Sequence, residues 1–152
     1  MTTQHRSNAR QTKPDSKGLH PRNLHRHGYD FPALVKTYPP LGSHVNKNAY
    51  GNLSIAFADP LAVKSLNTAL LKHHYNVVDW DIPTGSLCPP ILGRVDYIHY
   101  AAELLDAELT AAQATSQPKI TMLDIGIGAN GIYPLLACQI YGWHCVGSNI
   151  NP

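Results

Sequence analysis

A glycine-rich turn between two apolar runs constrains this chain more than any other feature. Residues 120–125 form a short apolar run typical of a buried strand, and residues 126–131 follow with a G-x-G-x-x-G pattern. Residues 132–141 carry apolar side chains at helical spacing and end before Gly142, and residues 144–150 again have the character of a strand. Strand, turn, helix and strand make one βαβ unit, which predicts an α/β fold with a parallel sheet.

Three interpretations of the glycine turn have to be weighed. Glycines permit positive φ and let a ligand approach the backbone, beside the unpaired N–H groups of a helix N-terminus. A dinucleotide site and a purely structural turn both fit this pattern. Asp124 favours S-adenosyl-L-methionine, because a carboxylate at the strand end can meet the ammonium group of that methyl donor. We therefore predict Asp124, Gly126 and Gly128 to bind this cofactor.

The end of the second strand is a further test of cofactor binding. An acidic residue there would hold the ribose hydroxyls in both cofactor classes. Asn149 occupies this place, 23 residues after Gly126. An asparagine can still accept a hydrogen bond from ribose but loses the stronger charge-assisted bond. Asn149 is therefore predicted to contact the cofactor, with reduced affinity.

The preceding part of the chain has the pattern of a small helical module. Helices are expected over 31–37, from Asp59-Pro60 to about Asn76, and from Val95 onward, with a short strand within 52–58. The expected core positions of the last helix are Ile98, Ala102, Leu105 and Leu109. Residues 80–94 contain three prolines and two glycines, which exclude a regular element over most of this stretch. This proline-rich loop is either part of a site or a rigid connector.

Charge is concentrated at the N-terminal end. Residues 1–30 hold six of the 12 Lys and Arg residues and only two acidic residues, so this part has a charge of +4 against +2 for the whole chain. A basic arm poor in apolar residues is expected to be disordered and to neutralise phosphates of RNA or DNA, although a solubilising tail would look the same. Four of the nine histidines also lie here, but no Cys pair or carboxylate stands at ligand spacing, and no metal is expected.

Composition narrows the class of protein further. Hydrophobic residues make up 43% of the chain, which is normal for a globular protein, and no apolar run is long enough to span a membrane. The N-terminus does not resemble a signal peptide, and the three cysteines have no disulfide or metal spacing. We expect a cytoplasmic monomer with no membrane partner.

Six motifs in one order extend this interpretation over residues 19–152. The motifs are Leu19-His20-Pro21-Arg22-Asn23, Phe57-Ala58-Asp59-Pro60, Trp80-Asp81-Ile82-Pro83, Leu87-Cys88-Pro89-Pro90, Gly93-Arg94-Val95-Asp96-Tyr97-Ile98-His99 and Leu123-Asp124-Ile125-Gly126-Ile127-Gly128-Ala129-Asn130. Together they closely resemble the ribosomal RNA large subunit methyltransferase F family, which is similar to eukaryotic methyltransferases that modify adenine in structured RNA.

The resemblance implies a Rossmann-like methyltransferase sheet and methyl transfer from S-adenosyl-L-methionine to N6 of an adenine in large-subunit (23S) ribosomal RNA. It implies that Arg94 contacts the cofactor and that Arg22 and Arg26 bind the RNA. Cys88 is expected to pack in its loop, because this chemistry needs no covalent intermediate.

One family motif is missing from the sequence. The resemblance implies a catalytic Asn-Pro-Pro-aromatic motif after the fourth strand, whose polar groups hold the target amine and whose ring stacks the flipped base. No such motif occurs in the 152 residues. We therefore expect a basic arm over 1–18, a helical RNA-binding and donor-loop module over 19–117, and an incomplete methyltransferase domain over 118–152, truncated at its C-terminus. The alternative is a fragment that binds RNA without catalysis.

Overall fold

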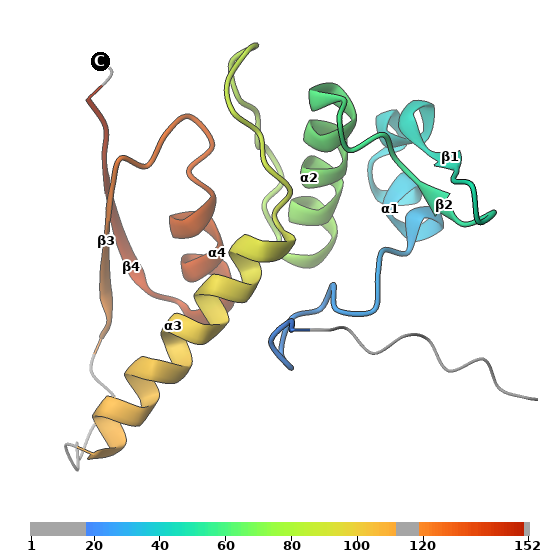
Figure 1. Cartoon of the computed structure of the whole chain (residues 1–152). Helices are drawn as coiled ribbons and strands as arrows, with labels where there is room; N and C mark the ends of the chain where they lie inside the picture. Colours follow the sequence, from blue (N-terminus) through green and yellow to red (C-terminus); the bar gives the residue numbers. More distant parts are fainter. Residues whose placement is uncertain (1–17, 112–118, 151–152) are drawn as a thin grey trace, which may run out of the picture.

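The computed structural model describes residues 18–111 and 119–150. The expected basic arm lies outside these residues except for Gly18, and so does the expected boundary between residues 117 and 118. Figure 1 shows the first helices and a small hairpin at one end of the molecule and a two-stranded sheet at the other. No helix within the described ranges is long and apolar enough to cross a membrane.

Before the proline-rich loop, the helical module contains two α-helices, a 3-10 helix and a small hairpin. These elements are α1 (Phe31–Thr37), η1 (Pro39–His44), β1 (Asn46–Lys47), β2 (Leu53–Ser54) and α2 (Pro60–His74). β1 and β2 pair in antiparallel fashion. The helix predicted over 31–37 is confirmed, whereas the strand predicted within 52–58 is limited to the two residues of β2.

Both ends of α2 follow from local chemistry. The Asp59 carboxylate accepts a hydrogen bond from the backbone N–H of Leu61 at 2.9 Å, and Pro60 occupies the first helical position, as the sequence predicted. The helix ends at His74, two residues earlier than expected. Asn76 has a φ of 54°, a left-handed conformation that cannot continue the helix.

α3 (Leu92–Ala111) begins three residues before the predicted start and is longer than the core that it covers. Val95, Ile98 and Ala102 are buried, whereas Leu105 is 37% exposed. The expectation that Leu105 lies in the core was wrong because α3 runs past α4 (Ile132–Tyr141) and its last turns have no helix against them (Figure 1). Helical periodicity correctly predicted which face of α3 is buried, but not how far along the helix other elements cover that face.

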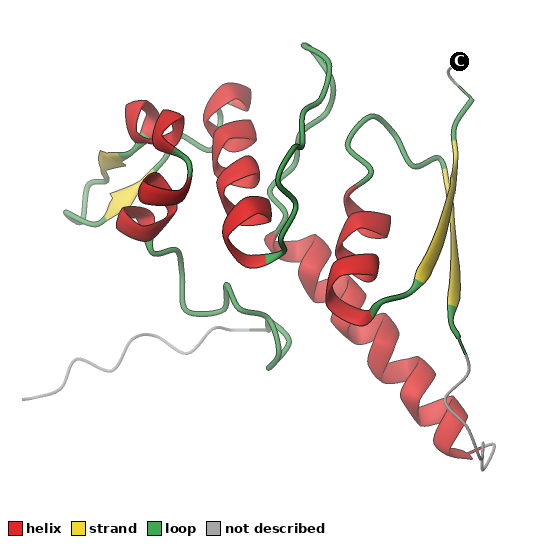
Figure 2. Ribbon diagram, turned by 180° about the vertical axis from the view of Figure 1, so that it is seen from behind, coloured by secondary structure: helices red, strands yellow, loops and turns green. Residues whose placement is uncertain are grey.

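β3 (Thr121–Ile125), α4 and β4 (His144–Ser148) form the predicted βαβ unit. The strands are parallel, with Leu123 opposite Val146, and α4 packs against both strands, with Leu136 and Ala137 buried in the core. Figure 2, seen from behind, shows the two strands at the outer edge of the molecule with the helices on one side only. The mixed α/β class, with the start of a Rossmann-like sheet, is confirmed.

Candidate cofactor site

Two predicted cofactor residues lie at the carboxyl ends of neighbouring parallel strands. Asp124 is the fourth residue of β3 and pairs in register with Gly147, and Asn149 directly follows β4. This edge is where open α/β sheets bind their ligands. Asp124 is half-buried, and Asn149 is exposed and accepts a hydrogen bond from the Ile150 N–H at 3.0 Å through its side-chain oxygen.

The glycine turn has the backbone conformation that its sequence predicted. Gly126, Gly128 and Gly131 have φ values of 79°, 66° and 55°, which residues with a side chain rarely adopt. A methyl group added at Gly126 or Gly128 would meet no atom within 4 Å. The backbone of the turn therefore faces open space that a ligand can enter, beside the N-terminus of α4.

A fourth glycine near the site was not singled out from the sequence. A methyl group at Gly147 would lie 2.3 Å from Cδ1 of Ile127, a residue of the glycine turn. The missing side chain of Gly147 lets Ile127 fold over β4 next to Asp124. The backbone N–H groups of Gly126 and Ile127 both donate to the Ser148 carbonyl, at 2.9 and 3.0 Å, which ties the turn to the end of β4.

The proline-rich loop contacts the glycine turn through Asn130. The Trp80 indole N–H donates to the backbone carbonyl of Asn130 at 3.0 Å, and the Asn130 amide donates to the carbonyl of Leu87 at 3.2 Å. The side-chain oxygen of the same asparagine accepts from the Ile132 N–H at 3.1 Å at the start of α4. These bonds hold the loop against the glycine turn of the candidate site.

Asn67 holds the other end of the loop. Its side chain is buried in α2, where the amide donates to the carbonyl of Pro89 at 2.9 Å and the oxygen accepts from the Ile91 N–H at 3.3 Å. Cys88 is half-buried and its Sγ lies 3.5 Å from the Asn67 amide, while burial raises the pKa of this thiol. Cys88 therefore packs in the loop, and a thiolate nucleophile is not favoured there.

Arg94 lies in the first turn of α3, where the proline-rich loop ends. It is half-buried, and its guanidinium donates to the carbonyl of Pro90 at 3.2 Å. Tyr97, one turn further along the same helix, packs edge-on against Tyr133 with ring centroids 5.2 Å apart. Because Tyr133 is in the first turn of α4, these contacts bring the N-terminal ends of α3 and α4 together at the candidate site.

Arg22 and Arg26, the predicted RNA contacts, lie elsewhere. The exposed Arg22 side chain donates to the carbonyl of His99 at 3.4 Å and sits 5.5 Å from the ring centre of Tyr141. Arg26 donates to the carbonyl of Pro21 at 3.4 Å. Tyr141 ends α4, so Arg22 and the glycine turn lie at opposite ends of this ten-residue helix, about 14 Å apart along its axis.

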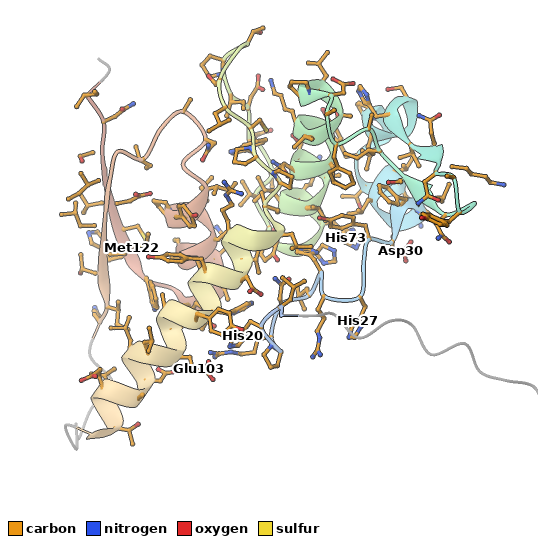
Figure 3. All side chains as sticks on the ribbon, viewed as in Figure 1. His20, His27, Asp30, His73, Glu103 and Met122 are labelled. Atoms are coloured by element: carbon orange, nitrogen blue, oxygen red, sulfur yellow. The ribbon has the colours of Figure 1, made fainter. Side chains whose placement is uncertain are left out.

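The histidines near Arg22 are structural. The His20 ring lies 3.3 Å from the Glu103 carboxylate and stacks on His99, as Figure 3 shows for the pair His20 and Glu103. His25 is buried and its Nε2 lies 2.7 Å from the hydroxyl of Tyr75. Among the described residues, no group of three or more His, Cys, Asp or Glu side chains could hold a metal ion.

A second structural role belongs to Asn23. It is buried, and its amide donates to the Asp96 carboxylate at 3.0 Å and to the Leu92 carbonyl at 3.1 Å. The backbone N–H of His20 donates to the same carboxylate at 2.6 Å. The segment before α1 is therefore fixed on α3, a long-range contact for which the sequence offers no local signal.

The fold and the candidate site together define the class of protein. A parallel βαβ unit with a positive-φ glycine turn, an acid at the end of the first strand and open space beside the turn is the core of α/β proteins that bind nucleotide-like cofactors. The sequence profile of a family described as RNA methyltransferase matches residues 13–152. The chain belongs to this RNA methyltransferase family.

Curated relatives carry a common name. The chain is 55% identical over 152 residues to the ribosomal RNA large subunit methyltransferase F of Saccharophagus degradans, an alignment that covers 97% of this chain and 48% of the relative. It is 60% identical over 135 residues to the protein of the same name from Shewanella baltica, with 89% and 36% covered. The chain thus spans about half or less of the length of these relatives.

Solved structures support the same assignment. The METTL16 methyltransferase domain superposes with a TM-score of 0.75 at 33% identity over 90% of this chain and 51% of that one. The N-terminal domain of human METTL16 in complex with SAH gives 0.74 at 32% identity, with 88% and 50% covered. The hMettl16 catalytic domain in complex with MAT2A 3′UTR hairpin 6 gives 0.72 at 33% identity, with 88% and 44% covered.

Proposed function

We propose that this chain carries the methyl-donor site and part of the RNA-binding surface of a methyltransferase that acts on N6 of an adenine in large-subunit ribosomal RNA. The observation that carries the proposal is the joint presence of Asp124, the open glycine turn and Asn149 at one sheet edge. The names of the relatives and the SAH and RNA complexes of METTL16 support the donor and the RNA substrate.

Each proposed donor contact follows from the chemistry of its residue. Asp124 binds the ammonium group, Gly126 and Gly128 let the ligand approach the backbone, and Asn149 accepts a hydrogen bond from ribose. Arg94 contacts the carboxylate of the donor from the first turn of α3. S-adenosyl-L-methionine, when bound, supplies an electrophilic methyl group, and the residues of this chain position it.

The chain alone is expected to bind the donor without transferring its methyl group, since the Asn-Pro-Pro-aromatic motif is not among its 152 residues. We assign residues 19–117 to RNA binding and donor-loop functions and residues 118–152 to the methyltransferase sheet. Robust methylation of unmodified large-subunit RNA by this polypeptide, measured with labelled donor, would contradict this part of the proposal.

Calorimetric titration with S-adenosylhomocysteine tests the donor site. We expect binding by the full chain and at least a tenfold weaker affinity for Asp124→Asn, because the amide cannot form the charge-assisted bond. Asp106→Asn, an exposed carboxylate of α3, is the matched control and should leave the affinity unchanged. Absence of binding at millimolar ligand would overturn the donor site and favour the alternative, an RNA-binding polypeptide without a cofactor.

The RNA-binding surface needs its own test. Fluorescence anisotropy with a large-subunit RNA fragment should show affinity that falls steeply with salt. If Arg22 and Arg26 each neutralise one phosphate of single-stranded RNA, the double Arg→Gln variant should lower the slope of log K against log salt by about 1.4. Lys36→Gln with Lys47→Gln removes the same charge from exposed positions of α1 and β1 and is the control. An equal effect of both double variants would argue against a specific role of Arg22 and Arg26.

A further inference from the structure

A groove runs along the polar face of α2, on the side of the helix that does not pack in the core. Its volume is about 680 Å³, within the range of roughly 300–1,000 Å³ that small-molecule sites occupy. It is lined by polar residues of α2 together with Tyr38, directly after α1, and residues 78–81. Figure 1 shows α2 between α1 and the chain segment that follows α2. No residue predicted to bind the cofactor or the RNA lines this groove.

The chain returns along α2 after the helix ends. The N–H of Val77 donates to the carbonyl of Leu71 at 3.1 Å, and the amine of Lys64 donates to the carbonyl of Ile82 at 3.0 Å. Leu71 and Lys64 are about two helical turns apart, so residues 77–82 run antiparallel to this part of α2. This path places Asp79 and Trp80 beside the polar face of the helix.

The groove contains both paired and unpaired polar groups. Lys64 forms an ion pair with Asp81, so these two charges neutralise each other. Lys72 and Asp79 are exposed, and neither has a hydrogen-bond or ion-pair partner among the described residues. The half-buried hydroxyl of Ser65 has no partner in that part of the chain either. The groove therefore presents one ammonium group, one carboxylate and one hydroxyl to a ligand.

Two aromatic rings add flat apolar surface to the groove. Trp80 and Tyr38 are half-buried, and neither contacts another aromatic ring among the described residues. The indole N–H of Trp80 is already bonded to the carbonyl of Asn130, so the ring can meet a ligand only through its apolar surface. Unpaired RNA bases stack on such rings, with a gain of about 1–3 kcal/mol per base. A ring platform beside an ammonium group fits the base and the phosphate of a nucleotide.

We propose that this groove binds a guanosine phosphate unit of the RNA, at a nucleotide other than the methylated adenine. The base stacks on Trp80, Lys72 binds the phosphate, and Asp79 binds the Watson–Crick edge of the base. Guanine carries two adjacent N–H donors on this edge, whereas adenine, cytosine and uracil each offer one donor group beside an acceptor. A carboxylate has only acceptors, so Asp79 favours guanine. The inference rests on the proposed function for the RNA as the source of the ligand, but not on donor binding.

NMR titration of the full chain with single nucleotides, without donor or large-subunit RNA, tests the base preference. Guanosine monophosphate should shift the indole signal of Trp80 and bind at least fivefold more tightly than the monophosphates of adenosine, cytidine and uridine. Asp79→Asn should abolish this preference, because the amide presents a donor as well as an acceptor. Asp106→Asn, an exposed carboxylate of α3 outside the groove, is the matched control and should retain the preference.

A second variant tests the phosphate contact. Lys72→Gln should weaken the binding of guanosine monophosphate about threefold, as expected for an exposed ion pair, and leave the binding of guanosine unchanged. Lys36→Gln removes the same charge from an exposed position of α1 and is the control. Because Asp79 and Lys72 are exposed and unpaired in the described structure, circular dichroism should show unchanged folding of both variants.

Short RNAs distinguish a guanosine of RNA from a free nucleotide. The pentanucleotide UUGUU should bind more tightly than UUAUU, and Asp79→Asn should remove the difference. A preference for guanine that is present in single nucleotides and absent from the pentanucleotides would overturn the assignment to RNA. No binding at millimolar nucleotide, equal binding of all four bases, or an Asp79→Asn variant that keeps the preference would overturn the site itself. Donor binding and salt-dependent RNA binding are measured separately, so a failure of the proposed function gives a different result.

Discussion

The indole N–H of Trp80 donates a hydrogen bond to the backbone carbonyl of Asn130, 3.0 Å away and fifty residues later in the chain. The side-chain amide of Asn130 donates to the carbonyl of Leu87 in the proline-rich loop, and its side-chain oxygen accepts from the N–H of Ile132, the first residue of α4. One asparagine thus connects the proline-rich loop to the βαβ unit. The position of the loop against the glycine turn depends on the bonds with Trp80 and Leu87.

Replacement of Asn130 should separate its roles. Asn130→Asp keeps the oxygen that accepts from Ile132 but loses the amide that donates to Leu87, and we expect a loss of about 1 kcal/mol in the free energy of unfolding. Asn130→Ala loses the acceptor for the Ile132 N–H as well and should cost about 2 kcal/mol. Urea unfolding measures both. Asn52→Ala, an exposed hairpin position, should be neutral, and equal losses for the two Asn130 variants would argue against a separate role of the amide.

Replacement of Asn67 should destabilise the fold more than replacement of an ordinary polar residue in a helix. Asn67→Ala leaves the Pro89 carbonyl and the Ile91 N–H without their partner beside the core, which we expect to cost about 2–4 kcal/mol. Hydrogen exchange of residues 82–91 should rise at the same time, because the loop loses its attachment to α2. A stability loss with unchanged exchange in the loop would show that Asn67 acts through α2 alone.

Local patterns were enough to predict most elements of the fold. The cap at Asp59-Pro60, the helix over 132–141 and the parallel strands follow from spacing and turn chemistry, which act within a few residues. The contacts of Asn67 and Asn130 could not be predicted, because each polar group finds its partner only after distant segments have packed. The exposure of Leu105 was missed for the same reason: periodicity does not show where the neighbouring helix ends.

The candidate site likewise has features that local patterns predict and features that depend on distant contacts. The glycine turn and the placement of Asp124 beside the end of β4 could be predicted from the strand–turn–helix pattern. The fit of Ile127 over Gly147 could not, since a glycine in a strand does not reveal which side chain approaches it. The resemblance implied roles for Arg22 and Arg26, and the structure adds that Arg22 also packs on Tyr141, far from the glycine turn.

Gly147→Ala should destabilise the βαβ unit. Its Cβ would lie 2.3 Å from Cδ1 of Ile127 and 3.3 Å from two further atoms of that side chain, so Ile127 has to move. We expect a cost of about 1–3 kcal/mol. Ile127→Ala in the same chain should recover most of this loss, because the clashing atoms are absent. Additive losses in the double-mutant cycle, measured by urea unfolding, would exclude this contact as the cause.

The buried His25 makes the stability depend on pH. Burial, with smaller contributions from His74 and His99, lowers the pKa of His25 from 6.5 to about 4. Because the folded pKa lies below the unfolded value, the neutral ring contributes stability that is complete above pH 6.5 and is lost as the pH falls toward 4. The loss amounts to at most about 3 kcal/mol.

Urea unfolding of His25→Gln between pH 7.5 and 4.5 checks this relation. The variant should be less stable at pH 7.5, because it loses the contact with Tyr75, but its stability should fall less steeply on acidification. His27→Gln replaces an exposed histidine and should follow the parent curve. Parallel curves for His25→Gln and the parent chain would assign the pH dependence to other groups.

Asn149→Asp tests the proposed donor site by a gain of affinity. Asn149 directly follows β4 and is exposed, so a carboxylate there has no desolvation cost in the free chain. A carboxylate accepts ribose hydroxyls in a charge-assisted bond, roughly twice as strong as the neutral bond of the amide, and we expect S-adenosylhomocysteine to bind about five- to tenfold more tightly. The increase should disappear with a ligand that lacks the ribose hydroxyls. Asn48→Asp adds the same charge in the distant hairpin turn and is the control. An equal gain of affinity from that variant would show that the effect comes from net charge and not from a contact with ribose.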